Sequence, residues 1–202
     1  MGGYGFGRAT QDQQKEYGLS PSAHGFTEIE CQFEGKRDAV QETTMVNSVI
    51  TEDQDAVVTE VQIAAPPERV FQALVDPQQV MSWWTSDECQ IESFAMETKP
   101  GGRWSYDTKP GKLNVNGVSK FHCDGEVLEY DPPRLLSYSW IANWHEDKTK
   151  RTVVRWELTP KAGGTHVKVT HSGLATLPIA RKDYSGGWVG VVEQLKNFVE
   201  KR

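Results

Sequence analysis

The sequence predicts an α+β fold in which a curved sheet of seven antiparallel strands wraps around one long C-terminal helix. Two observations support this prediction. Seven segments have a strand-like pattern and are joined by short turns, and the last segment has an apolar stripe at helical spacing. Two short helices are predicted after the first strand. Because the long helix must bury its stripe, we expect it to cross the concave face of the sheet.

The first strand and the two short helices follow one another directly. Val57–Ile63 alternates apolar and polar side chains, which is typical of a half-buried strand. A Pro-Pro pair ends this strand, and Pro67 suits the first turn of a helix that covers 68–75. Asp76 is the predicted N-cap of a second helix, which runs to about Trp83.

Six further strands complete the predicted sheet. Turn residues such as Pro110-Gly111 and Asp131-Pro132-Pro133 separate them. Because the connections are short, we expect successive strands to pair as an antiparallel meander. The predicted ranges are 88–94, 102–108, 119–130, 134–142, 152–160 and 165–172.

The C-terminal helix is predicted within the segment 187–202. Its apolar side chains recur at intervals of three and four residues and form one continuous face. Polar residues such as Glu193 and Lys196 take the opposite face. The apolar face consists of Trp188, Val191, Val192, Leu195, Phe198 and Val199.

Residues 1–55 differ in composition from the predicted domain, which occupies 56–202. This leader carries 4 Lys and Arg against 10 Asp and Glu, whereas 56–202 carries 18 of each. A segment so polar cannot bury enough surface to offset its conformational entropy. We therefore expect the leader to be disordered or weakly structured, with a short strand or helix around 27–33 as a candidate element.

Composition also excludes several classes of protein. The predicted domain has no excess of basic residues, so nucleic acid is not an expected partner. No apolar run is long enough to span a membrane, and the N-terminus lacks the apolar core of a secretion signal. Cys31, Cys89 and Cys123 are an odd number without C-x-x-C spacing, which indicates a cytoplasmic protein with reduced thiols.

Six phrases, in this order, resemble the SRPBCC (START-like) superfamily with its helix-grip fold. Within it, the resemblance is to the family named for the C-terminal domain of the heat-shock protein 90 ATPase activator. It covers about residues 57–202 and implies a fold that hosts binders, transporters, cyclases and co-chaperones. The phrases are Ala65-Pro66-Pro67-Glu68-Arg69-Val70-Phe71, Trp83-Trp84, Pro100-Gly101-Gly102-Arg103-Trp104, Gly125-Glu126-Val127-Leu128-Glu129, Pro132-Pro133-Arg134-Leu135 and Gly187-Trp188.

Aromatic residues are the main candidates for a binding site. Seven tryptophans occur in the predicted domain, and several lie on the faces of strands that would look toward the terminal helix. Such faces fill the core or line a cavity between the sheet and the helix. We expect a small apolar or aromatic ligand in this cavity. The candidate ligand-binding residues are Trp83, Trp104, Tyr138, Trp140, Trp156, His171 and Trp188.

Residues with a pattern suited to catalysis or metal binding are few. His166 and His171 are five apart on one strand and so point to opposite faces, and no histidine pair has metal-ligand spacing. A nucleophile elbow, a phosphate-binding glycine loop and an H-E-x-x-H motif are all absent from the sequence. We expect no metal, no cofactor and no catalytic residue, and a binding protein rather than an enzyme.

Two alternatives stay open. The first is a co-chaperone that activates a heat-shock protein 90 ATPase, as the resemblance implies. Such activators have a second, chaperone-binding N-terminal domain, and we expect the leader to be too short and too polar to form one. The second is a cyclase or hydrolase in which Tyr138 and His171 act as an acid–base pair within the cavity.

Met45 opens a segment that reads as a lead-in to the first strand. We hypothesise that translation starts at Met45 and that residues 1–44 come from an upstream reading frame. The intact mass of the protein isolated from its native source should then match a chain that begins at Met45. A mass that matches a chain beginning at Met1 would contradict this hypothesis.

Overall fold

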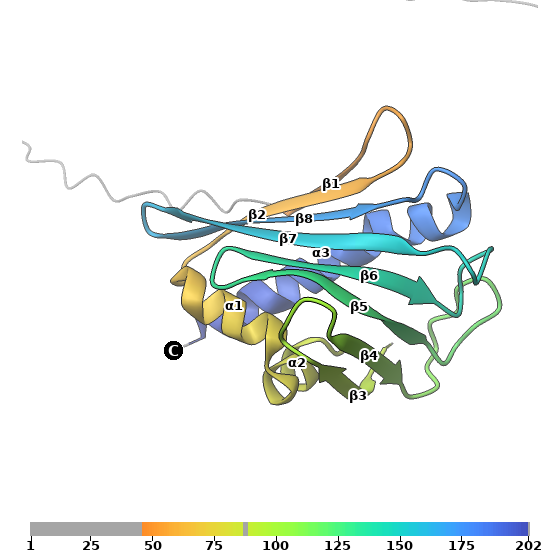
Figure 1. Ribbon diagram of the computed structural model, residues 1–202, viewed down its shortest axis with the longest axis horizontal. Helices are drawn as coiled ribbons and strands as arrows, with labels where there is room; N and C mark the ends of the chain where they lie inside the picture. Colours follow the sequence, from red (N-terminus) through yellow and green to blue (C-terminus); the bar gives the residue numbers. More distant parts are fainter. Residues whose placement is uncertain (1–45, 87–88, 202) are drawn as a thin grey trace, which may run out of the picture. The chain divides into compact units, whose positions relative to one another are not determined.

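The computed structural model describes residues 46–86 and 89–201, which form eight strands and three helices in an α+β fold (Figure 1). The predictions for residues 1–45, including the element at 27–33 and the start at Met45, lie outside the described residues. The helices are α1 (Pro67–Val75), α2 (Pro77–Trp83) and α3 (Pro178–Glu200). The strands are β1 (Asn47–Ile50), β2 (Val57–Ile63), β3 (Ile91–Met96), β4 (Arg103–Thr108), β5 (His122–Asp131), β6 (Leu135–Ala142), β7 (Thr152–Lys161) and β8 (Gly164–Ser172).

All eight strands form one antiparallel sheet with the order β1-β2-β8-β7-β6-β5-β4-β3. After β2, helices α1 and α2 take the chain to the opposite edge of the sheet, where β3 begins. From there a meander returns strand by strand to β8, which pairs with β2. Figure 1 shows α3 crossing one face of the sheet, with its C-terminal half behind α1. The predicted meander and the long C-terminal helix are therefore confirmed.

The sheet has eight strands rather than the seven predicted, because β1 lies before the predicted start of the domain. β1 pairs with β2, from Asn47 opposite Glu60 to Ile50 opposite Val57. The sequence of β1 does not alternate in the usual way, since Val49 is 58% exposed whereas half-buried Ser48 bonds through its hydroxyl to that of Thr59. A four-residue strand with its valine facing outward leaves no period-two pattern to detect.

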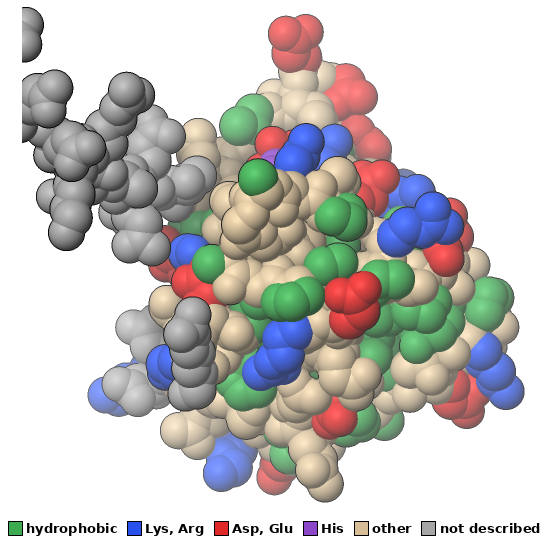
Figure 2. Space-filling model, turned by 90° about the vertical axis from the view of Figure 1, so that its left-hand side faces the viewer, with side chains coloured by type: hydrophobic (Ala, Val, Ile, Leu, Met, Phe, Trp, Pro, Cys, Tyr) green, Lys and Arg blue, Asp and Glu red, His purple; other side chains and the backbone are tan. Residues whose placement is uncertain are grey.

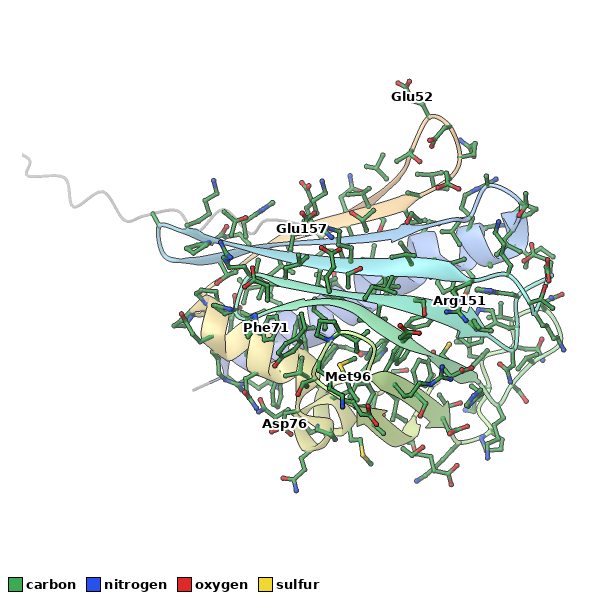
Figure 3. The ribbon with its side chains drawn as sticks, in the orientation of Figure 1. Glu52, Phe71, Asp76, Met96, Arg151 and Glu157 are labelled. Atoms are coloured by element: carbon green, nitrogen blue, oxygen red, sulfur yellow. The ribbon has the colours of Figure 1, made fainter. Side chains whose placement is uncertain are left out.

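The start signals of α1 and α2 act as the sequence predicts. Pro67 occupies the first turn of α1. The Asp76 carboxylate, at the junction of the two helices in Figure 3, accepts hydrogen bonds from the backbone N–H groups of Gln78 (2.9 Å) and Gln79 (3.2 Å). Trp83 Nε1 donates to the Ala73 carbonyl (2.8 Å), which fixes the end of α2 against α1.

Helix α3 has 23 residues and begins well before the predicted apolar face. The Glu146 carboxylate accepts from the backbone N–H groups of Ile179 and Ala180, so an acidic side chain caps the positive end of the helix. In the described ranges, no helix is long and apolar enough to cross a membrane. The buried side chains of α3 are Ala180, Tyr184, Trp188, Val192, Leu195 and Val199.

The core lies between α3 and the inner face of the sheet, and aromatic rings dominate it. Tyr138 and Trp140 on β6 and Trp156 on β7 are all buried, as their alternation predicts. Trp156 packs edge-on against Trp188 of α3, with ring centroids 5.5 Å apart. This contact brings α3 onto the middle of the sheet.

Fully buried His171 on β8 joins three elements through hydrogen bonds. Trp188 Nε1 on α3 donates to His171 Nδ1 (3.2 Å), so the neutral ring carries its proton on Nε2. From Nε2 it donates to Thr152 Oγ1 on β7 (2.8 Å), and the Thr152 hydroxyl donates to the Trp140 carbonyl (3.1 Å). Burial holds the pKa of His171 well below its ordinary value. A protonated ring would lose the acceptor that Trp188 needs.

This network predicts that the fold loses stability in acid. His171 is neutral in the folded state and gains a proton when the chain unfolds, so its contribution is complete above about pH 6.5 and declines as the pH falls below that value. His171→Gln should lower the free energy of unfolding at pH 7.5 by about 1–3 kcal/mol, because the buried Trp188 N–H and Thr152 hydroxyl lose the imidazole ring as their hydrogen-bond partner. Between pH 6.5 and 5, the free energy of unfolding of the variant should also fall less than that of the parent protein.

Urea unfolding at several pH values measures both effects. Burial also lowers the pKa of His145, so part of the pH dependence should remain in the variant. If the free energy of unfolding of His171→Gln depends on pH as steeply as that of the parent protein, the protonation of His171 does not limit the stability of the fold.

Candidate functional site

A cavity of about 520 Å³ opens between α3 and the sheet. Its walls come from residues 183–194 of α3, the residues after α2, the middle of β4, the loop before β5, and the end of β6 with the residues just after it. The lining residues are Trp84, Thr85, Ser86, Cys89, Tyr106, Leu113, Val115, Phe121, Trp140, Trp144, Asp183, Tyr184, Gly186, Gly187, Trp188, Gly190, Val191 and Gln194.

Seven of the eighteen residues that line the cavity are aromatic, and their rings contact one another. Half-buried Trp84 has its ring centroid 5.5 Å from that of Tyr106 and 6.3 Å from those of Trp140 and Trp188. The ring of Tyr184 lies 6.1 Å from that of Trp140. Rings in mutual contact have few free rotamers, so the wall keeps its shape when the cavity is empty.

Three glycines of α3 border the cavity. A Cβ atom built on Gly186, Gly187 or Gly190 would meet no heavy atom within 4 Å. Packing within the fold therefore does not require glycine here, in contrast to Gly125, where a Cβ would clash with the backbone of Ser139. Each glycine in a helix interior destabilises the helix by about 1 kcal/mol relative to alanine. These positions leave open space where side chains would otherwise fill the cavity.

Asp183 is the one charged side chain among the described residues that line the cavity. Burial raises its pKa to about 6, and the nearby Trp144 indole opposes this rise. The Trp144 N–H itself has no acceptor in good hydrogen-bond geometry among the described residues. Burial, together with the charge of Asp183, also raises the pKa of the Cys89 thiol. The cavity thus combines an aromatic wall with one carboxyl group.

Two of the seven predicted site residues, Trp140 and Trp188, line the cavity. The other five lie in the packed core behind it, where most are held by hydrogen bonds. Trp104 Nε1 donates to the Ser139 carbonyl (2.8 Å), and Trp156 Nε1 donates to the Tyr138 hydroxyl (3.0 Å). The five are Trp83, Trp104, Tyr138, Trp156 and His171, and each is at most 4% exposed.

Several cavity residues were not predicted as site residues. Trp84 follows directly after Trp83, and only the end of α2 decides which of the two rings faces the cavity. Tyr184 and Asp183 lie on the first turns of α3, a part of the helix that sequence reasoning did not recognise. The helical spacing of Tyr184 and Trp188 was the available signal, and the glycines between them obscured it.

Some histidines of the described residues pair with acidic side chains away from this cavity. His122 and Asp107 on the outer face of the sheet pair through Nδ1 and Oδ1 (2.9 Å), and His166 lies 3.8 Å from Glu60. Within residues 46–86 and 89–201, no three His, Cys, Asp or Glu side chains are grouped as metal ligands.

Comparisons with known proteins agree with this fold. Residues 64–200 match the model of a family described as Activator of Hsp90 ATPase homolog 1-like protein. No curated protein matches the chain. A solved structure from Mesorhizobium loti has 28% sequence identity and a TM-score of 0.57, and the match covers 72% of this chain and 97% of that one.

Two further solved structures show the same fold at lower identity. A protein from Rhodobacter sphaeroides has 19% identity and a TM-score of 0.62, over 76% of this chain and 96% of that one. An AHSA1-like protein from Aeromonas hydrophila has 22% identity and a TM-score of 0.57, over 72% and 92%. Since the family model spans well over half of the sequence, this chain belongs to the Activator of Hsp90 ATPase homolog 1-like family.

Proposed function

We propose that this domain binds a small, largely aromatic molecule in the cavity beside α3. The observation that supports the proposal most strongly is the open space in front of Gly186, Gly187 and Gly190, opposite a wall of aromatic rings. About 520 Å³ is within the range of small-molecule sites, which are mostly apolar with a few polar groups. A protein-binding role alone would not need such a hollow.

The apolar wall can supply enough affinity without many polar contacts. Burying about 300 Å² of apolar ligand surface at roughly 25 cal/mol/Å² gives about 7 kcal/mol before the entropy of association is subtracted. The remainder corresponds to dissociation constants near micromolar or weaker. Shape and aromatic stacking, rather than a dense set of hydrogen bonds, would select the ligand.

The same proposal includes a cytoplasmic location and a small molecule, rather than nucleic acid, as the partner. Cys89 and Cys123 are free thiols, which suits a reducing cytoplasm. On the face shown in Figure 2, Lys and Arg side chains are interspersed with Asp and Glu, and the described residues there form no continuous basic surface. This arrangement favours a small molecule over nucleic acid as the partner.

Filling the cavity should abolish binding without weakening the fold. Gly190→Leu places a side chain in the open space, and it replaces glycine by a better helix former. Ligand-induced changes in tryptophan fluorescence should disappear, while the melting temperature stays the same or rises. Glu193→Leu, which adds the same side chain on the exposed side of α3, should bind like the parent protein.

The measurement is a titration with 1-naphthol, flavone and a long-chain fatty alcohol, since Trp84, Trp140, Trp144 and Trp188 all line the cavity. Binding that survives Gly190→Leu would place the ligand elsewhere. If none of the compounds binds the parent protein, the proposal fails.

A co-chaperone role is the second candidate, and the description of the family favours it. A coupled assay with the cognate heat-shock protein 90 tests it directly. If binding of a small molecule is the function of the domain, the ATPase rate should stay at its basal level when the domain is added in excess. Stimulation that is unaffected by Gly190→Leu would favour the co-chaperone role instead.

Catalysis by Tyr138 and His171 receives no support from their positions. Neither side chain lines the cavity, and the two residues lie on strands β6 and β8, separated by β7. Burial raises the pKa of the Tyr138 hydroxyl well above its ordinary value, and burial lowers the pKa of His171 so that its ring stays neutral. Both groups are engaged in hydrogen bonds that stabilise the core.

A further inference from the structure

The Asp183 carboxyl group has an unusual environment for an acidic side chain on a helix. It is half-buried at the cavity wall, and no Lys, Arg or His of the described residues forms an ion pair with it. The neighbouring Arg181 guanidinium is directed to the backbone carbonyls of Gln54, Leu174 and Ala175. A partly buried carboxylate without a cationic partner is costly unless a cation joins it.

The rings around Asp183 supply the second half of a cation site. Tyr184, Trp144 and Trp140 contact one another, with centroids 6.1 to 6.4 Å apart, and all three line the same cavity. The faces of tyrosine and tryptophan rings attract cations, and groups of such rings recognise quaternary ammonium ions. We propose that the cavity is a site for an organic cation, with its ammonium group at Asp183 and its apolar part among the aromatic rings.

The glycines of α3 explain how such a ligand fits. Gly186 and Gly187 follow Asp183 by three and four residues and Gly190 by seven, so all three lie along the same side of the helix as the carboxyl group. Because these glycines have no side chains, the flat aromatic part of a ligand can approach the helix backbone while the ammonium group of the ligand stays at Asp183. The positive charge of a bound cation would also favour the ionised carboxylate, and so oppose the rise in pKa that burial causes.

The charge of the ligand can be tested separately from its shape. This inference rests on the proposed function, so the probes share one naphthylmethyl body and differ in the group attached to it, which is cationic, uncharged or anionic. They are (1-naphthylmethyl)trimethylammonium, its uncharged carbon isostere 1-neopentylnaphthalene, and the anion 1-naphthylacetate. Their dissociation constants are measured at pH 7.5 by tryptophan fluorescence with the full chain.

The parent protein should bind the cation at least about tenfold more tightly than the isostere, and the anion most weakly. Asp183→Asn should remove this preference, so that the cation and the isostere bind within about threefold of each other. Glu193→Gln removes the same charge from the exposed side of α3 and should keep the preference. Melting curves should show that Asp183→Asn is at least as stable as the parent, because it removes a buried charge.

Each contrary outcome has a distinct meaning. Equal binding of cation and isostere by the parent protein, or a preference that survives in Asp183→Asn, would overturn the cation site and leave the proposed function standing. Tightest binding of 1-naphthylacetate would overturn it as well, and would point to the unpartnered indole N–H groups of Trp140 and Trp144 as the selecting groups. If no probe binds, the proposed function fails together with this inference.

Discussion

The packing of α3 across the aromatic face of the sheet is the constraint on which the rest of this structure depends. Trp188 holds the helix in place from two sides, because its ring packs against Trp156 and its N–H donates to His171. A second buried contact, between Tyr184 Oη and His145 Nε2 (2.7 Å), fixes the N-terminal half of the helix. These contacts keep polar atoms paired in the core, which makes the position of the helix specific.

The cavity follows from this packing and from three missing side chains. Tyr184 and Trp188 reach across to the sheet one helical turn apart, while Gly186, Gly187 and Gly190 place nothing beside them. The same helix therefore has two functions, since one side of it seals the core and an adjacent side borders a hollow. The lower helix propensity of glycine is offset by the cap at Glu146 and by the buried contacts.

The fold could be predicted in most of its parts, because its signals are local. Alternation in β2, the Asp76 cap and the short turns each correspond to an element that the structure contains. β1 escaped prediction because its valine faces outward, so the strand shows no alternation even though it pairs with β2 across a short connection. The site residues were harder to predict, because a run of aromatic residues on strands does not show which rings face a cavity and which are packed behind it. Trp140 and Trp156 have the same pattern in sequence, and only the path of α3 separates them.

The seven indole N–H groups allow the most direct test of this account. In a ¹H–¹⁵N correlation spectrum, addition of (1-naphthylmethyl)trimethylammonium should shift the signals of the cavity residues most: Trp84, Trp140, Trp144 and Trp188. The signals of Trp83, Trp104 and Trp156, which lie in the packed core, should move little. The largest shifts at these three core residues, or no shifts at any indole, would contradict a ligand site beside α3.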